Sequence, residues 1–286
     1  MDTHRTLISA QALAARLSAG TPTVVIDARF DLGQPAAGQT AYVAGHVPGA
    51  RYAHLDTDLS GSKSGTNGRH PLPDRAAFAA WAGAQGIAPG VQVVAYDDQG
   101  GAYAARLWWM LRWLGHDAVA VLDGGFSAWR AAGGAVDAAA AGVPAPSAAY
   151  PAAYPATAEP AMPTLDAAAL LAQLGRVRLV DARAGERFRG EVEPLDPVAG
   201  HIPGATLRCF KDNLQADGRF KPSQVLHAEF AAWGTPAAEV VHQCGSGVTA
   251  CHNLLAMAHA GLPGSRLYPG SWSEWCADPS RPVARG

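Results

Sequence analysis

The chain repeats itself once along its length, and this repeat limits the folds that are open to it. Val25–Arg29 (Val-Ile-Asp-Ala-Arg) returns as Leu179–Arg183 (Leu-Val-Asp-Ala-Arg), roughly 150 residues further on. Three more pairs follow in the same order: Gly45–Ala50 with Gly200–Ala205, Phe78–Trp81 with Phe230–Trp233, and Asp123–Trp129 with Pro269–Trp275. A period of this length is that of a domain rather than of a solenoid unit. The sequence therefore predicts two copies of one domain in tandem.

The residues between the two copies differ in composition from the rest of the chain. Ala and Pro dominate residues 134–163, and the prolines discourage a helix there. We therefore expect an N-terminal domain over residues 1–133, an extended linker over 134–163 and a C-terminal domain over 164–286. At 286 residues the chain is long enough for two domains of ordinary size.

Short apolar segments alternate with longer helical patterns in both copies. The predicted strands are residues 23–26, 91–96, 118–122, 177–180 and 239–243, and the predicted helices are residues 9–17, 78–84, 103–114 and 165–174. This alternation predicts an α/β fold in which each domain is a parallel sheet with helices on both faces. In such sheets ligands bind at the carboxyl ends of the strands.

Composition and cysteine usage narrow the function classes. The net charge of −2 and the lack of a basic block give no reason to expect nucleic acid or an anionic membrane as partner. The first residues lack the apolar stretch of a signal peptide, and no run of about 18 apolar residues occurs. The four cysteines have neither framework spacing nor a Cys-x-x-Cys pair, which argues against a disulfide scaffold and a metal or dithiol site. We therefore expect a reduced, cytoplasmic protein.

A glycine-rich loop, Cys-Gly-Ser-Gly-Val-Thr, follows the predicted strand 239–243 and precedes an apolar helical pattern. This order places Cys244 at the carboxyl end of a strand. The backbone N–H groups of Gly245, Gly247, Val248 and Thr249, with the positive end of the following helix, can bind an anion. Such surroundings favour the thiolate, which is the nucleophilic form of cysteine. The loop therefore indicates sulfur chemistry at Cys244.

Together these motifs resemble tandem-domain rhodanese-type sulfurtransferases, the family of the 3-mercaptopyruvate and thiosulfate sulfurtransferases. The two Asp-Ala-Arg turns, the two Gly-His-Val/Ile-Pro-Gly-Ala segments and the Cys244 loop carry the resemblance, which covers nearly the whole chain. It implies that Cys244 takes sulfur from a donor as a persulfide and passes it to a thiophilic acceptor in a ping-pong sequence, without metal or cofactor. Asp97 stands in the first copy where Cys244 stands in the second, which implies that the first domain is catalytically silent.

The resemblance also bears on the sulfur donor. Thiosulfate-specific members tend to carry cationic side chains within the loop, whereas Gly-Ser-Gly is neutral and resembles the 3-mercaptopyruvate branch. In that branch a loop serine is grouped with a histidine and an aspartate from the first domain as a proton-handling unit. Ser246 matches the serine and His70 the histidine. Asp56 is the better match for the acid and Asp58 the alternative, because the glycine- and serine-rich loop between leaves the register open.

Two arginines bind the donor carboxylate in the 3-mercaptopyruvate branch, which suits a planar anion. Arg187 matches the first of them. The second should lie near Leu195, where this chain has no arginine, and Arg189 and Lys211 are candidates to replace it. This departure keeps a thiosulfate:cyanide sulfurtransferase open as the alternative function.

Functions outside the family fit less well. A phosphatase or arsenate reductase needs an arginine just after the loop to hold an oxyanion, and Ala250 and Cys251 stand there instead. A non-enzymatic sulfur carrier or regulatory module predicts a degraded loop, whereas the cysteine and both glycines are present. We therefore expect an enzyme, a sulfurtransferase. Its partners would be a small-molecule sulfur donor and, as acceptor, a thiol, a thioredoxin-like protein or cyanide.

Overall fold

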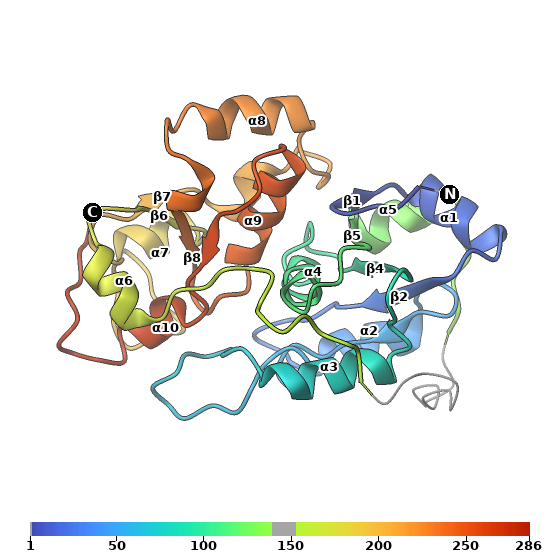
Figure 1. Ribbon diagram of the computed structural model, residues 1–286, viewed down its shortest axis with the longest axis horizontal. Helices are drawn as coiled ribbons and strands as arrows, with labels where there is room; N and C mark the ends of the chain where they lie inside the picture. Colours follow the sequence, from blue (N-terminus) through green and yellow to red (C-terminus); the bar gives the residue numbers. More distant parts are fainter. Residues whose placement is uncertain (1, 139–152) are drawn as a thin grey trace. The chain divides into compact units, whose positions relative to one another are not determined.

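The computed structural model describes residues 2–138 and 153–286, which fall into two compact units (Figure 1). Unit 1 takes in Met1–Ser60, Pro73–Ala161 and Ala216–Phe220, and unit 2 takes in Gly61–Leu72, Met162–Gln215 and Lys221–Gly286. The middle of the predicted linker, residues 139–152, lies outside the described residues. The segment Gly61–Leu72, which carries His70, therefore belongs to unit 2 although it comes early in the chain.

Unit 1 is built on a five-stranded parallel sheet with the strand order β1-β5-β4-β2-β3. Its elements are β1 (Leu7–Ile8), α1 (Ala10–Ser18), β2 (Thr23–Asp27), α2 (Ala37–Ala44), β3 (Arg51–Tyr52), α3 (Arg75–Ala84), β4 (Gln92–Tyr96), α4 (Ala104–Trp113), β5 (Val119–Leu122) and α5 (Gly125–Ala131). Helices flank the sheet, which confirms the predicted α/β class for this copy (Figure 1).

Unit 2 has a four-stranded parallel sheet in the order β7-β6-β8-β9. Its elements are α6 (Ala167–Gln173), β6 (Arg178–Asp181), α7 (Gly185–Arg189), β7 (Thr206–Leu207), η1 (Phe210–Asn213), α8 (Ser223–Ala231), η2 (Ala237–Glu239), β8 (Val240–Gln243), α9 (Ala250–His259), β9 (Arg266–Leu267) and α10 (Ser271–Trp275). The strands β6 to β9 pair in the same relative order as β2 to β5, which confirms the tandem duplication. A single parallel bridge between Thr164 and Leu267 takes the place of the β1 pairing.

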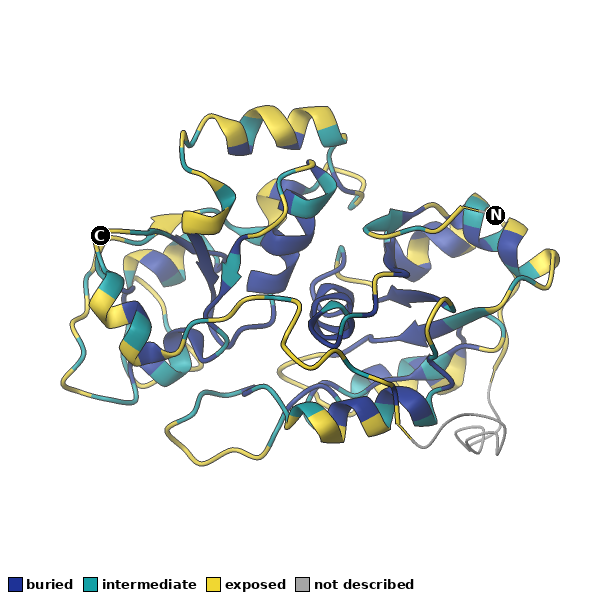
Figure 2. Ribbon diagram, viewed as in Figure 1, coloured by how far each residue is buried: buried dark blue, intermediate teal, exposed yellow. Residues whose placement is uncertain are grey.

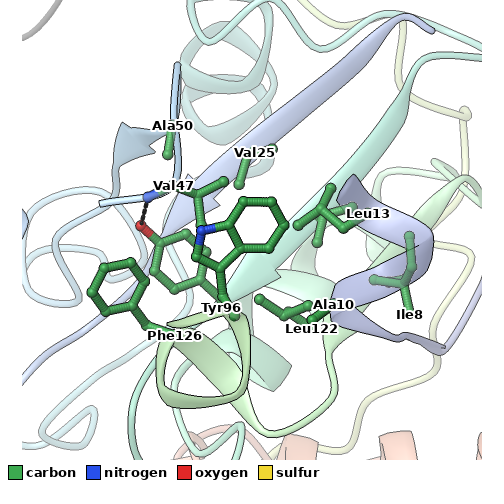
Figure 3. Packing of buried hydrophobic residues seen from close by; sticks show 12 residues of the cluster. Ile8, Ala10, Leu13, Val25, Val47, Ala50, Tyr96, Leu122 and Phe126 are labelled. Atoms are coloured by element: carbon green, nitrogen blue, oxygen red, sulfur yellow. Dashed lines mark hydrogen bonds between the residues drawn. The ribbon is translucent and has the colours of Figure 1, made fainter. Parts of the chain in front are cut away.

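One face of the first sheet packs against α1 and α5. Leu13 of α1 and Phe126 of α5 are buried in one cluster with Val25 and Tyr96 of the sheet (Figure 3). Burial of a side chain of this size contributes roughly 2 kcal/mol. The Tyr96 hydroxyl, at the end of β4, also accepts a hydrogen bond from the Val47 N–H (3.2 Å). The repeated Gly-His-Val-Pro-Gly-Ala segment is thereby tied to the carboxyl end of a strand.

The helices that follow β4 and β8 are buried on nearly every side (Figure 2). In α4 the run Leu107–Leu111 is apolar around the whole helix, and in α9 the run Ala250–Met257 is buried throughout. A helix without a polar face must be covered on all sides. Each of these helices therefore begins in a protected position after a central strand. The connection after β8 is buried from Cys244 to Val248, whereas the one after β4 exposes Asp98 and Gln99.

His242 in β8 gives the fold a pH-dependent stability. Its ring is fully buried with Nε2 3.1 Å from Met257 Sδ, and burial lowers the pKa of His242 to about 3. In the unfolded chain a histidine has a pKa of about 6.5. Between these two values the unfolded state binds a proton that the native state does not, so stability is lost as the pH falls. We expect His242 alone to lower the free energy of unfolding by about 2 kcal/mol between pH 7 and pH 5.

Chemical denaturation at pH 7 and pH 5 measures this effect when the wild type is compared with His242→Gln, which takes up no proton. We expect the variant to lose about 2 kcal/mol less than the wild type over the interval. An equal loss in both proteins would show that other groups carry the acid sensitivity.

Candidate active site

Cys244 lies directly after β8, and the first turn of α10 holds its backbone. The Cys244 carbonyl accepts a hydrogen bond from the Trp272 N–H (3.0 Å), and its N–H donates to Ser271 Oγ (3.1 Å). The Gly245 carbonyl accepts from the Ser273 N–H (2.9 Å). Cys244 is only 2% exposed. The nucleophile predicted from the sequence therefore stands on a backbone that is fixed from outside its own loop.

Gly247 and Ser271, which hold the loop in this arrangement, both have a positive φ angle. Gly247 has φ +75°, and a Cβ atom there would lie 2.2 Å from the Pro269 carbonyl oxygen, so no other residue fits. Ser271 has φ 55° and is the one non-glycine residue with positive φ in the ranges that the structure covers. Such a conformation costs on the order of 1 kcal/mol or more and persists where its surroundings enforce it. At Ser271 it places the hydroxyl that receives the Cys244 N–H.

The remaining loop residues lead into α9. The Val248 and Thr249 carbonyls accept hydrogen bonds from the N–H groups of Cys251 (3.0 Å) and His252 (3.1 Å). The Cys251 thiol donates to the Gly247 carbonyl (3.3 Å) and is fully buried. Cys251, a buried residue of α9, therefore contacts the loop directly.

Ser246 is the loop side chain that meets a titratable group. Its Oγ lies 2.7 Å from His70 Nδ1, and the two residues are only 6% and 2% exposed. The segment that carries His70 is fixed within unit 2, because the Arg69 N–H donates to Ser273 Oγ (2.9 Å). The structure thus brings two of the predicted site residues together, and His70 can exchange a proton with the Ser246 hydroxyl.

The two candidates for the acid, Asp56 and Asp58, lie in unit 1 after β3. Asp58 Oδ2 accepts a hydrogen bond from the His54 N–H (2.7 Å), and the Asp58 N–H donates to the His54 carbonyl (2.9 Å). Burial raises the pKa of Asp58. The Asp58 carboxylate therefore closes its own turn.

Two guanidinium groups converge on Gly245, the residue after Cys244. A Cβ atom on Gly245 would lie 3.1 Å from Arg69 Nη2 and 3.3 Å from Arg187 Nη1. Arg187, on α7, is one of the residues that the sequence predicts here. Arg69 is not, although it directly precedes the predicted histidine. The absence of a side chain at Gly245 lets both cations approach the loop.

The position expected to hold a second arginine lies at the surface. The Leu195 side chain is 42% exposed. Arg189 pairs with Glu191 (2.6 Å), with both side chains about half exposed, and Lys211 is exposed on η1. The second cation beside Arg187 is therefore Arg69 rather than a residue of the loop around Leu195.

Two buried carboxylates face these cations. Asp196 pairs with Arg69 through one oxygen and with Arg187 Nη2 through the other (3.1 Å). Glu193 Oε1 lies 2.7 Å from Arg187 Nη2. The Asp196 and Glu193 side chains are 4% and 3% exposed, and burial, reinforced by Glu193 and opposed by the arginines, raises the pKa of Asp196. Two positive and two negative groups thus stand beside the cysteine loop.

The Asp-Ala-Arg turns tie down the strand ends in both units. Arg183 donates to Asp181 Oδ2 (2.7 Å) and to the Gly200 carbonyl (2.8 Å). In unit 1 the same bonds run from Arg29 to Asp27 and to the Gly45 carbonyl. Their presence in both copies fits a structural role, since only one copy carries the cysteine.

Asp97 occupies in unit 1 the place that Cys244 occupies in unit 2. The Asp97 carbonyl accepts from the Phe126 N–H (3.0 Å), which matches the bond between Cys244 and Trp272. Its carboxylate accepts four backbone hydrogen bonds of 2.8–2.9 Å, from the N–H groups of Gln99, Gly101, Tyr103 and Ala104. The connection after β4 is therefore an anion-binding loop filled by its own side chain.

Two other kinds of site are absent from the residues that the structure describes. Residues 2–138 and 153–286 contain no helix long and apolar enough to cross a membrane. The same residues contain no group of three or more His, Cys, Asp or Glu side chains that could hold a metal ion.

Comparison with known proteins places this geometry in a family. The rhodanese-like domain model matches residues 9–132 and 164–278. A relative from Pseudomonas aeruginosa, named probable 3-mercaptopyruvate sulfurtransferase, is 52% identical over 286 residues, or 98% of each chain. Bovine thiosulfate sulfurtransferase is 35% identical over 295 residues, 99% of this chain and 96% of its own. The solved structure of 3-mercaptopyruvate sulfurtransferase from Leishmania major superposes with TM-score 0.79 at 32% identity, covering 95% of this chain and 74% of that one.

Proposed function

Because this chain belongs to the tandem-domain rhodanese family, we propose that it is a sulfurtransferase whose donor is 3-mercaptopyruvate. The observation that carries the choice of donor is the convergence of Arg69 and Arg187 on Gly245, one residue from the nucleophile. Two planar guanidinium groups suit a carboxylate, which accepts two hydrogen bonds from each fork. Arg69 Nε is buried and has no hydrogen-bond partner in the part of the chain that the structure describes, which fits a donor position kept for a ligand.

In this proposal the Cys244 thiolate attacks the sulfur of 3-mercaptopyruvate, and the carbon–sulfur bond breaks. The carbon fragment leaves as the enolate of pyruvate and takes a proton to become pyruvate. The sulfur stays on Cys244 as a persulfide, and the thiolate of an acceptor then attacks the outer sulfur and releases Cys244. Backbone N–H groups of the loop 244–249 would bind the sulfur anion. No electrons enter or leave the cycle.

Ser246 and His70 are the groups we assign to the proton. Their contact of 2.7 Å is short enough for direct transfer, and burial excludes competing water. We retain Asp56 as the acid of the proposed proton-handling unit, on the family resemblance and because Asp58 closes its own turn. A proton delivered here would neutralise the enolate as it forms.

We also propose that the first domain, residues 1–133, is catalytically silent in that it has no nucleophile of its own, and that the domain after the linker, residues 164–286, carries the nucleophile. The support for silence is Asp97, whose carboxylate fills the loop of unit 1 and cannot carry a transferable sulfur. Acceptors of the proposed classes are a small thiol, a thioredoxin-like protein or cyanide. A reducing, cytoplasmic location is proposed on the cysteine spacing alone.

Thiosulfate remains the second candidate donor, because paired arginines also attract a sulfur oxyanion and bovine thiosulfate sulfurtransferase is a relative. The experiment that separates the two compares kcat/KM for 3-mercaptopyruvate and thiosulfate with the same acceptor and pH. We expect 3-mercaptopyruvate to be preferred at least tenfold, or about 1.4 kcal/mol of transition-state discrimination. A tenfold preference for thiosulfate would replace the proposed donor with the second candidate.

A further inference from the structure

Asp196 is the buried carboxylate closest to the donor cations. Its two oxygens pair with different arginines, Arg69 on one side and Arg187 on the other, and its side chain is 4% exposed. The N–H of Asp196 donates to Glu193 Oε1 (3.2 Å), so its backbone is held as well. One carboxylate therefore bridges the two groups that are proposed to receive the donor.

Glu193 completes the balance of charge at this site. It pairs with Arg187 (2.7 Å) and also lies 3.4 Å from Arg183 Nη1. Arg183 already pairs with Asp181. The cations left for a donor, Arg69 and Arg187, are thus opposed by two buried anions. A donor that enters meets a site whose net charge is near zero rather than strongly positive.

We propose that Asp196 is a specificity-determining residue that selects a singly charged carboxylate donor over the dianion thiosulfate. The inference rests on the proposed function, since it presumes that Arg69 and Arg187 bind the donor. The physical reason is that a nearby negative charge repels a dianion about twice as strongly as a monoanion. In a buried site solvent screens this difference only weakly. Asp196 therefore positions the arginines and, at the same time, limits how much negative charge they accept.

Asp196→Asn tests the proposal because it keeps the shape and a hydrogen-bond acceptor while removing the charge. The readout is the ratio of kcat/KM for 3-mercaptopyruvate to kcat/KM for thiosulfate, measured with one acceptor at constant ionic strength. We expect the ratio to shift about tenfold toward thiosulfate. Glu191→Gln is the matched control, since it removes the same charge from an exposed carboxylate nearby, paired with Arg189. The control should leave the ratio unchanged.

A purely structural role for Asp196 gives a different result. Disordered arginines would lower kcat/KM for both donors by a similar factor, and an equal loss, no change, or a shift toward 3-mercaptopyruvate would overturn the proposal. Asp196→Glu, which keeps the charge, should hold the ratio within about threefold of the wild type. A tenfold shift in this variant as well would also count against the charge as the cause.

A measurement on the wild type covers the case in which Asp196→Asn does not fold. A site whose cations are balanced should show no steeper fall in kcat/KM with salt for thiosulfate than for 3-mercaptopyruvate. A much steeper fall for the dianion would reveal an uncompensated positive site and overturn the inference. Failure of the proposed function looks different, because the wild type would then turn over neither donor or would itself prefer thiosulfate at least tenfold. If turnover still depends on Cys244 but the ratio of kcat/KM for the two donors is the same in Asp196→Asn as in the wild type, only the proposed role of Asp196 is lost.

Discussion

Replacing Cys244 with serine is expected to abolish sulfur transfer, with kcat/KM reduced roughly 10³-fold or more. The hydroxyl of serine is a far weaker nucleophile at neutral pH, and it cannot form a persulfide. The loop itself should survive, because its fixed points are backbone groups: the Cys244 carbonyl and N–H bond to Trp272 and Ser271 in either residue. Steady-state assays with 3-mercaptopyruvate and mass spectrometry of the donor-treated protein measure the two consequences. The wild type should gain one sulfur atom and the variant none.

Cys209→Ser is the control for this experiment. Cys209 is the one cysteine of the four that is not fully buried, so it is the thiol that competes most directly for a reactive donor. Burial raises the pKa of Cys209, which disfavours its thiolate. We expect Cys209→Ser to retain both turnover and the added sulfur. Turnover that survives in Cys244→Ser and disappears in Cys209→Ser would overturn the proposed mechanism.

Removing either donor arginine should produce the second largest effect. Arg69→Gln and Arg187→Gln are each expected to lower kcat/KM for 3-mercaptopyruvate by about 10- to 100-fold, since a hydrogen bond to a charged group contributes about 1.5–3 kcal/mol. Most of the loss should lie in KM, because the carboxylate is bound in both the ground state and the transition state. Arg69→Lys keeps the charge without the planar fork and should recover only part of the loss.

A single-turnover assay separates donor binding from a general disturbance of the site. It starts with protein that already carries the persulfide and measures transfer of the sulfur to the acceptor. The donor has left by that stage, so single-turnover rates for the second half-reaction should be close to those of the wild type. Arg189→Gln provides the matched control, because it removes an exposed guanidinium of the same helix that pairs with Glu191 at the surface. If Arg69→Gln leaves the KM for 3-mercaptopyruvate unchanged, Arg69 does not bind the donor.

The central strands and the position of the Cys244 loop after β8 were predictable because their signals are local. A run such as Val-Val-Ala-Tyr before a turn, or Val-Val-His-Gln before Cys244, combines apolar residues with an abrupt change to glycine-rich sequence. The expected segments 91–96 and 239–243 correspond to β4 and β8, and the helix expected over 103–114 corresponds to α4. The outer strands β1, β3, β7 and β9 have two residues each, which is too short for any period to be read.

The two arginines that we propose for donor binding were only half predictable, and the cause is the path of the chain. Arg187 stands in the second copy, close in sequence to the segment in which its partner was expected. Arg69 lies about 120 residues earlier, in a segment that packs with unit 2. The hydrogen bond from the Arg69 N–H to Ser273 Oγ joins positions that no spacing rule connects. Only the three-dimensional structure places Arg69 beside Gly245.

The four backbone bonds to Asp97 have a consequence for the two halves of the chain over a catalytic cycle. A covalently attached carboxylate fills the loop of unit 1 at all times. In unit 2 the same place holds the Cys244 side chain, whose length and charge change on the proposed mechanism each time it gains or loses a sulfur atom. On that mechanism, thermodynamic linkage changes the stability only of the unit that carries the transferred sulfur. We therefore expect the melting point of unit 2, and not that of unit 1, to depend on the sulfur that Cys244 carries.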